Sequence, residues 1–203
     1  YYPTKEPDRE ILNSALTYII SCDSCGGDIP LVKKWWLNKT SDGGDAIKPE
    51  YNDGGVIYNH IKLENHSEDY DPKDGPVTRQ SAECPHCDYP VGKDEIKSKL
   101  ANNQFHYSIY GVNYKTPDEE WHFRAGLDVD KKGMEKARER VESDFDLLTF
   151  LTEPIDVSSR TNDPTNYGMD EWRDIFTPRQ LVVNYEYLKA FEEYAPKIRE
   201  NHS

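Results

Sequence analysis

The chain has 203 residues, of which 35% are hydrophobic, so it is long enough to bury a real core in one large or two small domains. It carries 38 acidic against 25 basic side chains and a formal net charge of −13, which repels a phosphate backbone and argues against a chain that grips DNA over its whole surface. Its longest apolar run, residues 15–20, has the length of a strand, which excludes a membrane-spanning segment.

The first predicted strand, residues 15–21, is rich in β-branched and aromatic side chains and leads directly to the pair Cys22 and Cys25. Gly26 and Gly27 follow that pair and permit the positive φ that such a turn needs. Residues 29–37 then predict a returning strand. Alternation and turn residues predict the elements that follow, namely a turn at 42–45, a strand at 55–63, a polar loop at 65–75 and a lead-in to the second cysteine pair at 77–82.

The second pair, Cys84 and Cys87, completes the cysteines of the chain. Two Cys-x-x-Cys turns deliver four thiolates to one metal, and a site closed by four thiolates is typical of structural zinc. Disulfides or four unrelated free thiols are the alternatives, although paired two-residue spacings without a secretory segment favour zinc. Because 58 residues separate Cys25 from Cys84, more than the roughly 15–20 of a compact ribbon, we expect a substantial insertion between the two turns.

The remaining elements become helical toward the C-terminus. We expect a helix at 93–101, strands at 105–114 and 120–125, a helix at 130–148 and an irregular connector at 152–168. The sequence therefore predicts an α+β fold, in which zinc-ribbon β-hairpins with a long insertion precede a helical C-terminal segment. We place the boundary between the β-rich domain, residues 1–127, and the helical segment with its connector, residues 128–203.

A long terminal helix begins with a strong start signal. Thr177 stands at the N-cap, Pro178 at the first helical position and Gln180 three residues after the cap, which predicts a capping box. Phe176 and Leu181 are placed to form the hydrophobic staple. Pro196 is expected to kink or end this helix.

Three segments, 25–39, the cysteine pair 84–87 and 167–181 with the sequence YGMDEWRDIFTPRQL, resemble the adenine-specific DNA methylases that contain a zinc ribbon. The resemblance covers nearly the whole chain, as the middle of a longer protein. Family members carry a glycine-rich S-adenosylmethionine motif upstream and an Asp-Pro-Pro-Tyr catalytic motif downstream, and this sequence contains neither. The sequence Asp163-Pro164-Thr165-Asn166 lacks the second proline and the tyrosine of that motif.

The resemblance implies a fragment of an S-adenosylmethionine-dependent adenine-N6 DNA methyltransferase, with structural zinc in this part and S-adenosylmethionine only in the full-length protein. It implies DNA, the rest of the methylase and helicase-like phage-defence components as partners of the whole protein, in the cytoplasm. The acidity then reflects either a high-salt habitat or a positive face elsewhere in the larger protein. A free-standing zinc-ribbon module that binds other proteins is the alternative.

Five further residues are candidates for contact with DNA or with the methylase core. Lys33 and Lys34 place positive charge beside Trp35 and Trp36, a combination used in single-strand or flipped-base recognition. Packing of this strand against the methylase core is the simpler alternative, and at least one of the two tryptophans is expected in a core because strand neighbours face opposite sides. Arg179, near a helix N-terminus, contacts DNA phosphate or the methylase core, or lies on the surface beside the cap.

Overall fold

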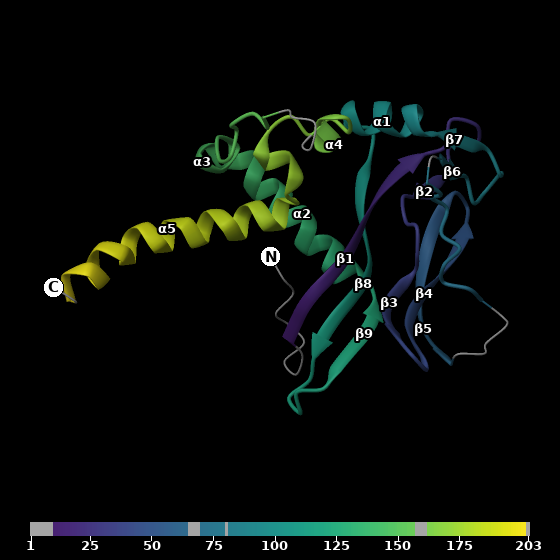
Figure 1. Ribbon diagram of the computed structural model, residues 1–203, viewed down its shortest axis with the longest axis horizontal. Coiled ribbons are helices and arrows are strands. Elements are labelled where there is room, and N and C mark those ends of the chain that lie inside the picture. The colour runs from purple at the N-terminus through teal and green to yellow at the C-terminus, as the bar shows by residue number, and fades with distance from the viewer. Residues whose placement is uncertain (1–9, 65–69, 80, 157–161, 202–203) are drawn as a thin grey trace. The chain divides into compact units, whose positions relative to one another are not determined.

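A computed structural model describes residues 10–64, 70–79, 81–156 and 162–201. The chain divides into two compact units, one within residues 2–131 and one within residues 132–203. Among the described residues, the first unit contains all of the strands and one complete helix, and the second is helical. The expected α+β fold is therefore confirmed, with the β-rich part first and the helices at the C-terminal end (Figure 1).

A four-stranded antiparallel sheet forms the framework of the first unit. Strand β1 (Glu10–Ser21) pairs on one side with β2 (Asp28–Pro30) and on the other with β8 (His106–Lys115), and β8 also pairs with β9 (Trp121–Ala125). In Figure 1 the long strands β1, β8 and β9 run side by side. The sheet thus joins residues on both sides of the cysteine-bearing segment and fixes the first cysteine pair at the end of β1.

The expected insertion between the cysteine pairs is a second, three-stranded antiparallel sheet. It consists of β3 (Trp36–Thr40), β4 (Gly43–Asn52) and β5 (Gly55–Glu64), in that order. The prediction of a turn at 42–45 is wrong at its glycines, because Gly43 and Gly44 begin β4. A Cβ at Gly43 would lie 1.9 Å from the carbonyl oxygen of Leu63 and one at Gly44 would lie 2.1 Å from that of Asn38, so these glycines permit close backbone approach on both sides.

The predicted returning strand at 29–37 is interrupted. Residues 31–35 leave the first sheet after β2, and β3 begins only at Trp36. The backbone of this connection is bonded to other parts of the unit, since Leu31 N donates to Tyr18 O and Trp35 N donates to Pro72 O. These long-range hydrogen bonds take the place of continuous strand pairing. The apolar run 29–37 therefore contributes β2 to one sheet and the start of β3 to another.

The second cysteine pair lies in a small hairpin of its own. Strands β6 (Ser81–Glu83) and β7 (Pro90–Gly92) pair antiparallel, and helix α1 (Lys93–Ala101) follows with the predicted bounds. Of the predicted polar loop, residues 65–69 lie outside the described residues, and residues 70–75 carry no strand or helix.

Trp35 is the centre of a core cluster in the first unit. Its side chain is fully buried and packs with Val32 and Ile47, and its ring centroid lies 5.6 Å from that of Tyr110. Burial of these aromatic and aliphatic side chains supplies the apolar contact that holds the inserted sheet to the framework.

The second unit consists of short helical pieces and one long helix. Helix α2 (Asp128–Ser143) starts in the first unit, and α3 (Phe145–Leu148), α4 (Asn162–Thr165), a 3₁₀ helix η1 (Trp172–Ile175) and α5 (Pro178–Asn201) follow. The predicted helix at 130–148 is divided, because the Asp144 carboxylate caps a new helix by accepting from the backbone of Asp146 and Leu147. The predicted connector likewise contains α4, and its residues 157–161 lie outside the described residues.

The start of α5 is as predicted, and of the two outcomes expected at Pro196, a kink or an end, the end does not occur. Gln180 Oε1 accepts from Thr177 N at 2.9 Å and Thr177 Oγ1 accepts from Gln180 N at 3.4 Å, which completes the capping box. Phe176 packs against the core cluster that contains Leu181, Val182 and Tyr185. The helix passes through Pro196 to Asn201, so this proline does not terminate it. None of the helices in the described part of the chain combines the length and apolar character that a membrane crossing requires.

Candidate metal centre

The two cysteine pairs lie at the tips of two hairpins with the same register. In the first hairpin Ser21 pairs with Asp28, and in the second Glu83 pairs with Pro90. The pairs Ile20 with Ile29 and Ala82 with Val91 extend the same correspondence along the strands. Each residue of the first hairpin therefore has its counterpart 62 positions later in the second, although their sequences are alike only at the cysteines.

Each turn is closed by the same two backbone hydrogen bonds. In the first, Gly26 N donates to Cys22 O and Cys22 N donates to Gly27 O, both at 2.8 Å. In the second, Asp88 N donates to Cys84 O and Cys84 N donates to Tyr89 O, both at 2.9 Å. The residue after the second cysteine is left-handed in both turns, Gly26 with φ of 74° and Asp88 with φ of 59°. Glycine and aspartate both tolerate this conformation, so two different sequences form one turn.

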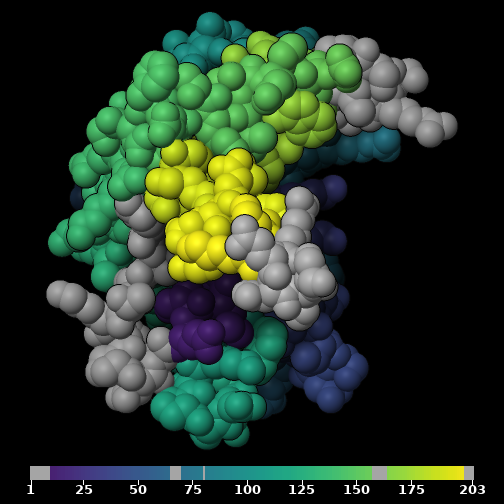
Figure 2. Space-filling view, turned by 90° about the vertical axis from the view of Figure 1, so that its left-hand side faces the viewer, coloured from purple at the N-terminus to yellow at the C-terminus, as the bar shows by residue number. Residues whose placement is uncertain are grey.

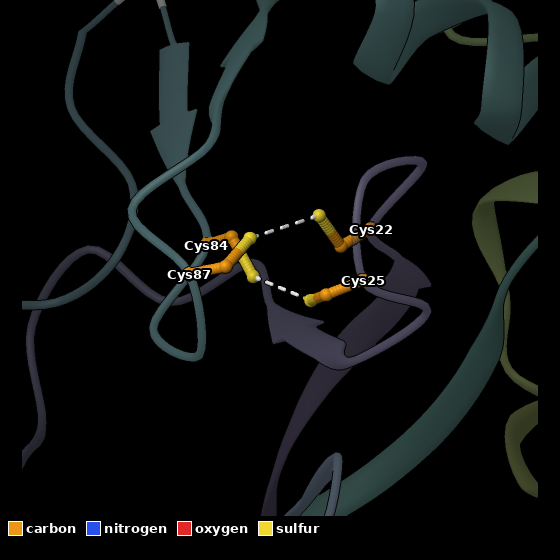
Figure 3. Close-up of side chains that lie close together, drawn as sticks. All are labelled: Cys22, Cys25, Cys84 and Cys87. Atoms are coloured by element: carbon orange, nitrogen blue, oxygen red, sulfur yellow. Dashed lines mark hydrogen bonds between the residues drawn. The ribbon is translucent and has the colours of Figure 1, made fainter.

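The four sulfur atoms meet between the two turns, as Figure 3 shows. All four Sγ atoms lie within 4.8 Å of one another. Two of these contacts join the turns, from Cys22 Sγ to Cys87 Sγ and from Cys25 Sγ to Cys84 Sγ, each at 3.7 Å. A metal with thiolate bonds of about 2.3 Å in tetrahedral geometry separates its sulfur ligands by about 3.8 Å, whereas a disulfide requires about 2.05 Å. The spacing fits a shared metal ion, and the four cysteines are free thiols in this arrangement.

The two cysteines of the second pair differ in burial and in the pKa of their thiols. The first cysteine of each pair is buried, with Cys22 3% exposed and Cys84 fully buried, and the second cysteine is exposed. Burial raises the pKa of the Cys84 thiol to about 12. A hydrogen bond from the backbone of Tyr89 lowers the pKa of the exposed Cys87 thiol to about 7. Cys87 therefore ionises first, and a cation is needed to hold Cys84 as a thiolate at neutral pH.

Side chains around the two cysteine turns make contacts that hold the turns in place. The His86 ring lies over Gly27, where a Cβ would come within 2.6 Å of the histidine Cδ2. The same ring also meets Tyr51 of β4 edge to face, with centroids 5.6 Å apart. Lys99 of α1 forms an ion pair with Asp23 inside the first turn. The sequence gives no local sign of these contacts, because each joins segments far apart in the chain.

The predicted basic and aromatic residues of segment 33–36 divide between surface and core. Lys33 and Lys34 are exposed, Trp35 is fully buried and Trp36 is half-buried. Lys39 Nζ lies 5.8 Å from the centroid of the Trp36 ring. Trp35 is therefore a core residue and has no exposed surface for stacking on a base, while Lys33, Lys34 and Trp36 retain exposed surface.

Arg179 is 2% exposed, so its expected surface position is wrong. It is the second residue of α5, directly after Pro178. A guanidinium with so little exposed surface cannot contact a DNA phosphate unless the structure around it rearranges. The burial of Arg179 therefore favours a structural role inside the folded protein. The capping box formed by Thr177 and Gln180 explains the start of α5 without it.

The four predicted cysteines thus come together, and the other predicted residues do not join them. Comparison of the chain with family models, with curated proteins and with solved structures finds no match. What can be said of its chemistry therefore follows from the geometry: four convergent thiols that can hold a metal ion.

Proposed function

We propose that the four cysteines bind one structural zinc ion, and that the first unit is a zinc ribbon stabilised by this ion. The observation that carries this proposal is the sulfur cluster, in which four Sγ atoms lie within 4.8 Å of one another. Four thiolates complete the tetrahedral coordination of zinc and leave no position for water or substrate. Zinc bound here contributes folding free energy by joining two hairpins that are distant in sequence.

We also propose that this unit belongs to the central part of an S-adenosylmethionine-dependent adenine-N6 DNA methyltransferase. Support comes from the three segments that resemble the zinc-ribbon methylases, residues 25–39, 84–87 and 167–181. The first two surround the metal centre, and the third contains η1 and the capping box of α5. In this proposal cofactor binding and methyl transfer require the flanking motifs, so the 203 residues alone have neither activity.

The zinc ribbon would then serve the larger enzyme as a rigid platform. Four thiolates, two matched turns and the contacts of His86 and Lys99 fix its shape without a catalytic group. Such a platform suits recognition of the DNA target, or contact with the rest of the methylase and with helicase-like defence partners.

The test uses the full-length reading frame that contains this segment. Purified full-length protein should transfer a tritiated methyl group from S-adenosylmethionine to DNA, with N6-methyladenine as the product by mass spectrometry. Cys84→Ser should lose zinc and lower the melting temperature, because metal binding is coupled to folding. Ser24→Ala, an exposed non-ligand in the first turn, is the control and should retain both.

The two parts of the proposal fail separately. A zinc-loaded full-length protein that transfers no methyl group and lacks both flanking motifs would contradict the methylase and favour an interaction module. An active enzyme without zinc would contradict the metal centre alone.

A further inference from the structure

A cleft of about 610 Å³ opens beside the second cysteine turn. Its wall includes Cys84 and Pro85 of that turn. Three cationic side chains line it, Lys33 from the connection before β3 and Lys73 and Arg79 from the segment before β6. All three are exposed. Positive charge from two segments about forty positions apart is therefore gathered in one concave place.

Main-chain hydrogen bonds join the two segments at the cleft, residues 32–35 and residues 72–77. Trp35 N donates to Pro72 O at 2.7 Å, and Val77 N donates to Val32 O at 3.2 Å. At Gly75 a Cβ would lie 2.2 Å from Val32 O, so only glycine permits this close approach. The backbone positions that carry Lys33, Lys73 and Arg79 are thus fixed relative to one another by main-chain contacts.

The cations in the cleft have unused binding capacity. Neither Lys33 nor Arg79 forms an ion pair with any residue in the described part of the chain, and Lys73 Nζ lies 3.5 Å from the carboxylate of Asp71. Asp74 and Glu83 also line the cleft, so the lining carries three positive and two negative side chains. With zinc bound, the Cys84 thiolate adds a third negative group to this lining. What favours an anion here, in a chain with a net charge of −13, is the gathering of three exposed cations in one concave place.

An aromatic side chain completes the lining. Tyr51 of β4 reaches the cleft, and its ring is braced by the edge-to-face contact with His86. Burial raises the pKa of Tyr51 well above its usual value, so its phenol stays a neutral hydrogen-bond donor. Cations that follow a phosphate backbone beside an aromatic ring are the combination that single-stranded nucleic acid requires.

We propose that this cleft binds the phosphates of single-stranded nucleic acid. Lysine and arginine are the phosphate ligands of proteins, and arginine binds phosphate oxygens in a bidentate manner. A volume of about 610 Å³ lies in the range of small-ligand sites, about 300–1,000 Å³, so the cleft has room for part of a single strand. The site goes beyond the function proposed above and does not depend on the parent protein's being a methylase.

The chain itself supplies the control. Lys34 follows Lys33, is exposed and carries the same charge, but it does not line the cleft. Lys33→Glu and Lys34→Glu change the net charge equally. A difference between them therefore reports the cleft and not the overall field of the protein.

The experiment measures fluorescence anisotropy of a fluorescein-labelled oligothymidylate of about 12 nucleotides at about 50 mM salt. We expect Lys33→Glu and Arg79→Glu each to weaken binding about tenfold. Each should also make the slope of log affinity against log salt shallower by about 0.7, the value for one lost phosphate contact on a single strand. Lys34→Glu should change the affinity by about twofold or less. Circular dichroism and zinc content show that every variant is folded.

Three results would overturn the proposal. One is that the unmodified protein does not bind the oligonucleotide at low salt. Another is that Lys34→Glu weakens binding as much as Lys33→Glu, which would assign the effect to general electrostatics. The third is that polyglutamate at equal charge concentration displaces the oligonucleotide equally well, in which case the cleft binds acidic peptides.

Discussion

Gly27 of the first cysteine turn and His86 of the second are packed so closely that no side chain fits between them. A Cβ at position 27 would lie 2.6 Å from Cδ2 and 2.9 Å from Cγ of the His86 ring. Since Gly27 lacks the positive φ of Gly26, the need for glycine here is steric and not conformational. The two turns are thus matched to each other by side-chain packing as well as by their sulfur atoms.

Gly27→Ala should therefore destabilise the first unit by about 1–3 kcal/mol through overpacking, measured by urea denaturation. Gly55→Ala is the matched control, because a Cβ there meets only Asn52 O at an ordinary 3.6 Å, and it should change the free energy of unfolding by about 0.5 kcal/mol or less. In the His86→Ala background Gly27→Ala should cost much less. An equal cost in both backgrounds would contradict the steric account.

Asp130 forms a buried ion pair with Arg124, six residues earlier in the chain. Its buried carboxylate accepts from the Arg124 guanidinium at 2.6 and 3.1 Å and from Leu127 N at 2.9 Å. Asp130→Ala should cost about 3–5 kcal/mol, because it leaves a largely buried guanidinium without this partner. Asp128→Ala removes a carboxylate that is 87% exposed and should cost about 1 kcal/mol at most. Urea denaturation of both variants is the measurement, and equal losses would refute a special role for the buried pair.

The 203-residue chain should neither bind S-adenosylmethionine nor methylate DNA. Its sequence contains neither the glycine-rich cofactor motif nor Asp-Pro-Pro-Tyr. Isothermal titration calorimetry and a tritiated-methyl transfer assay check this expectation. Saturable cofactor binding at micromolar ligand would contradict the proposed assignment of this segment to the central part of a methylase.

Duplex DNA should bind weakly at about 0.15 M salt, with a dissociation constant above the usual non-specific range of about 10⁻⁴–10⁻⁶ M. The reason is the net charge of −13, which opposes the counterion release that drives non-specific binding. Gel shifts with a duplex of random sequence provide the measurement. Tight binding that persists as the salt is raised would contradict this reasoning.

Local signals predicted the elements that depend on neighbouring residues. The spacing of Cys22, Cys25, Cys84 and Cys87 predicted their convergence, and the residues around Thr177 predicted the start of α5. Helix 93–101 also has its predicted bounds. Each Cys-x-x-Cys turn and each helix start is determined by residues close together in the chain, where backbone geometry and capping act. The meeting of the two cysteine turns was predicted from the need of one metal ion for four ligands.

Features that depend on distant segments were missed. Gly43 and Gly44 resemble a turn, and only the approach of Leu63 and Asn38 places them in a strand. The expectation that at least one of Trp35 and Trp36 lies in a core is confirmed by Trp35, but no local pattern indicated which of the two, or that Arg179 is buried. Lys73 lies in the predicted polar loop, and Arg79 lies just after it. Only the backbone hydrogen bonds between this part of the chain and residues 32–35 bring these two side chains into one cleft with Lys33.

The metal content of the purified chain is the most direct test of the account. Elemental analysis of protein prepared without added metal should give one zinc per chain, and X-ray absorption should show four sulfur ligands at about 2.3 Å. This result follows from four Sγ atoms within 4.8 Å and cross-turn contacts of 3.7 Å. Less than about half an equivalent of zinc, together with two disulfides in the mass spectrum, would contradict the account.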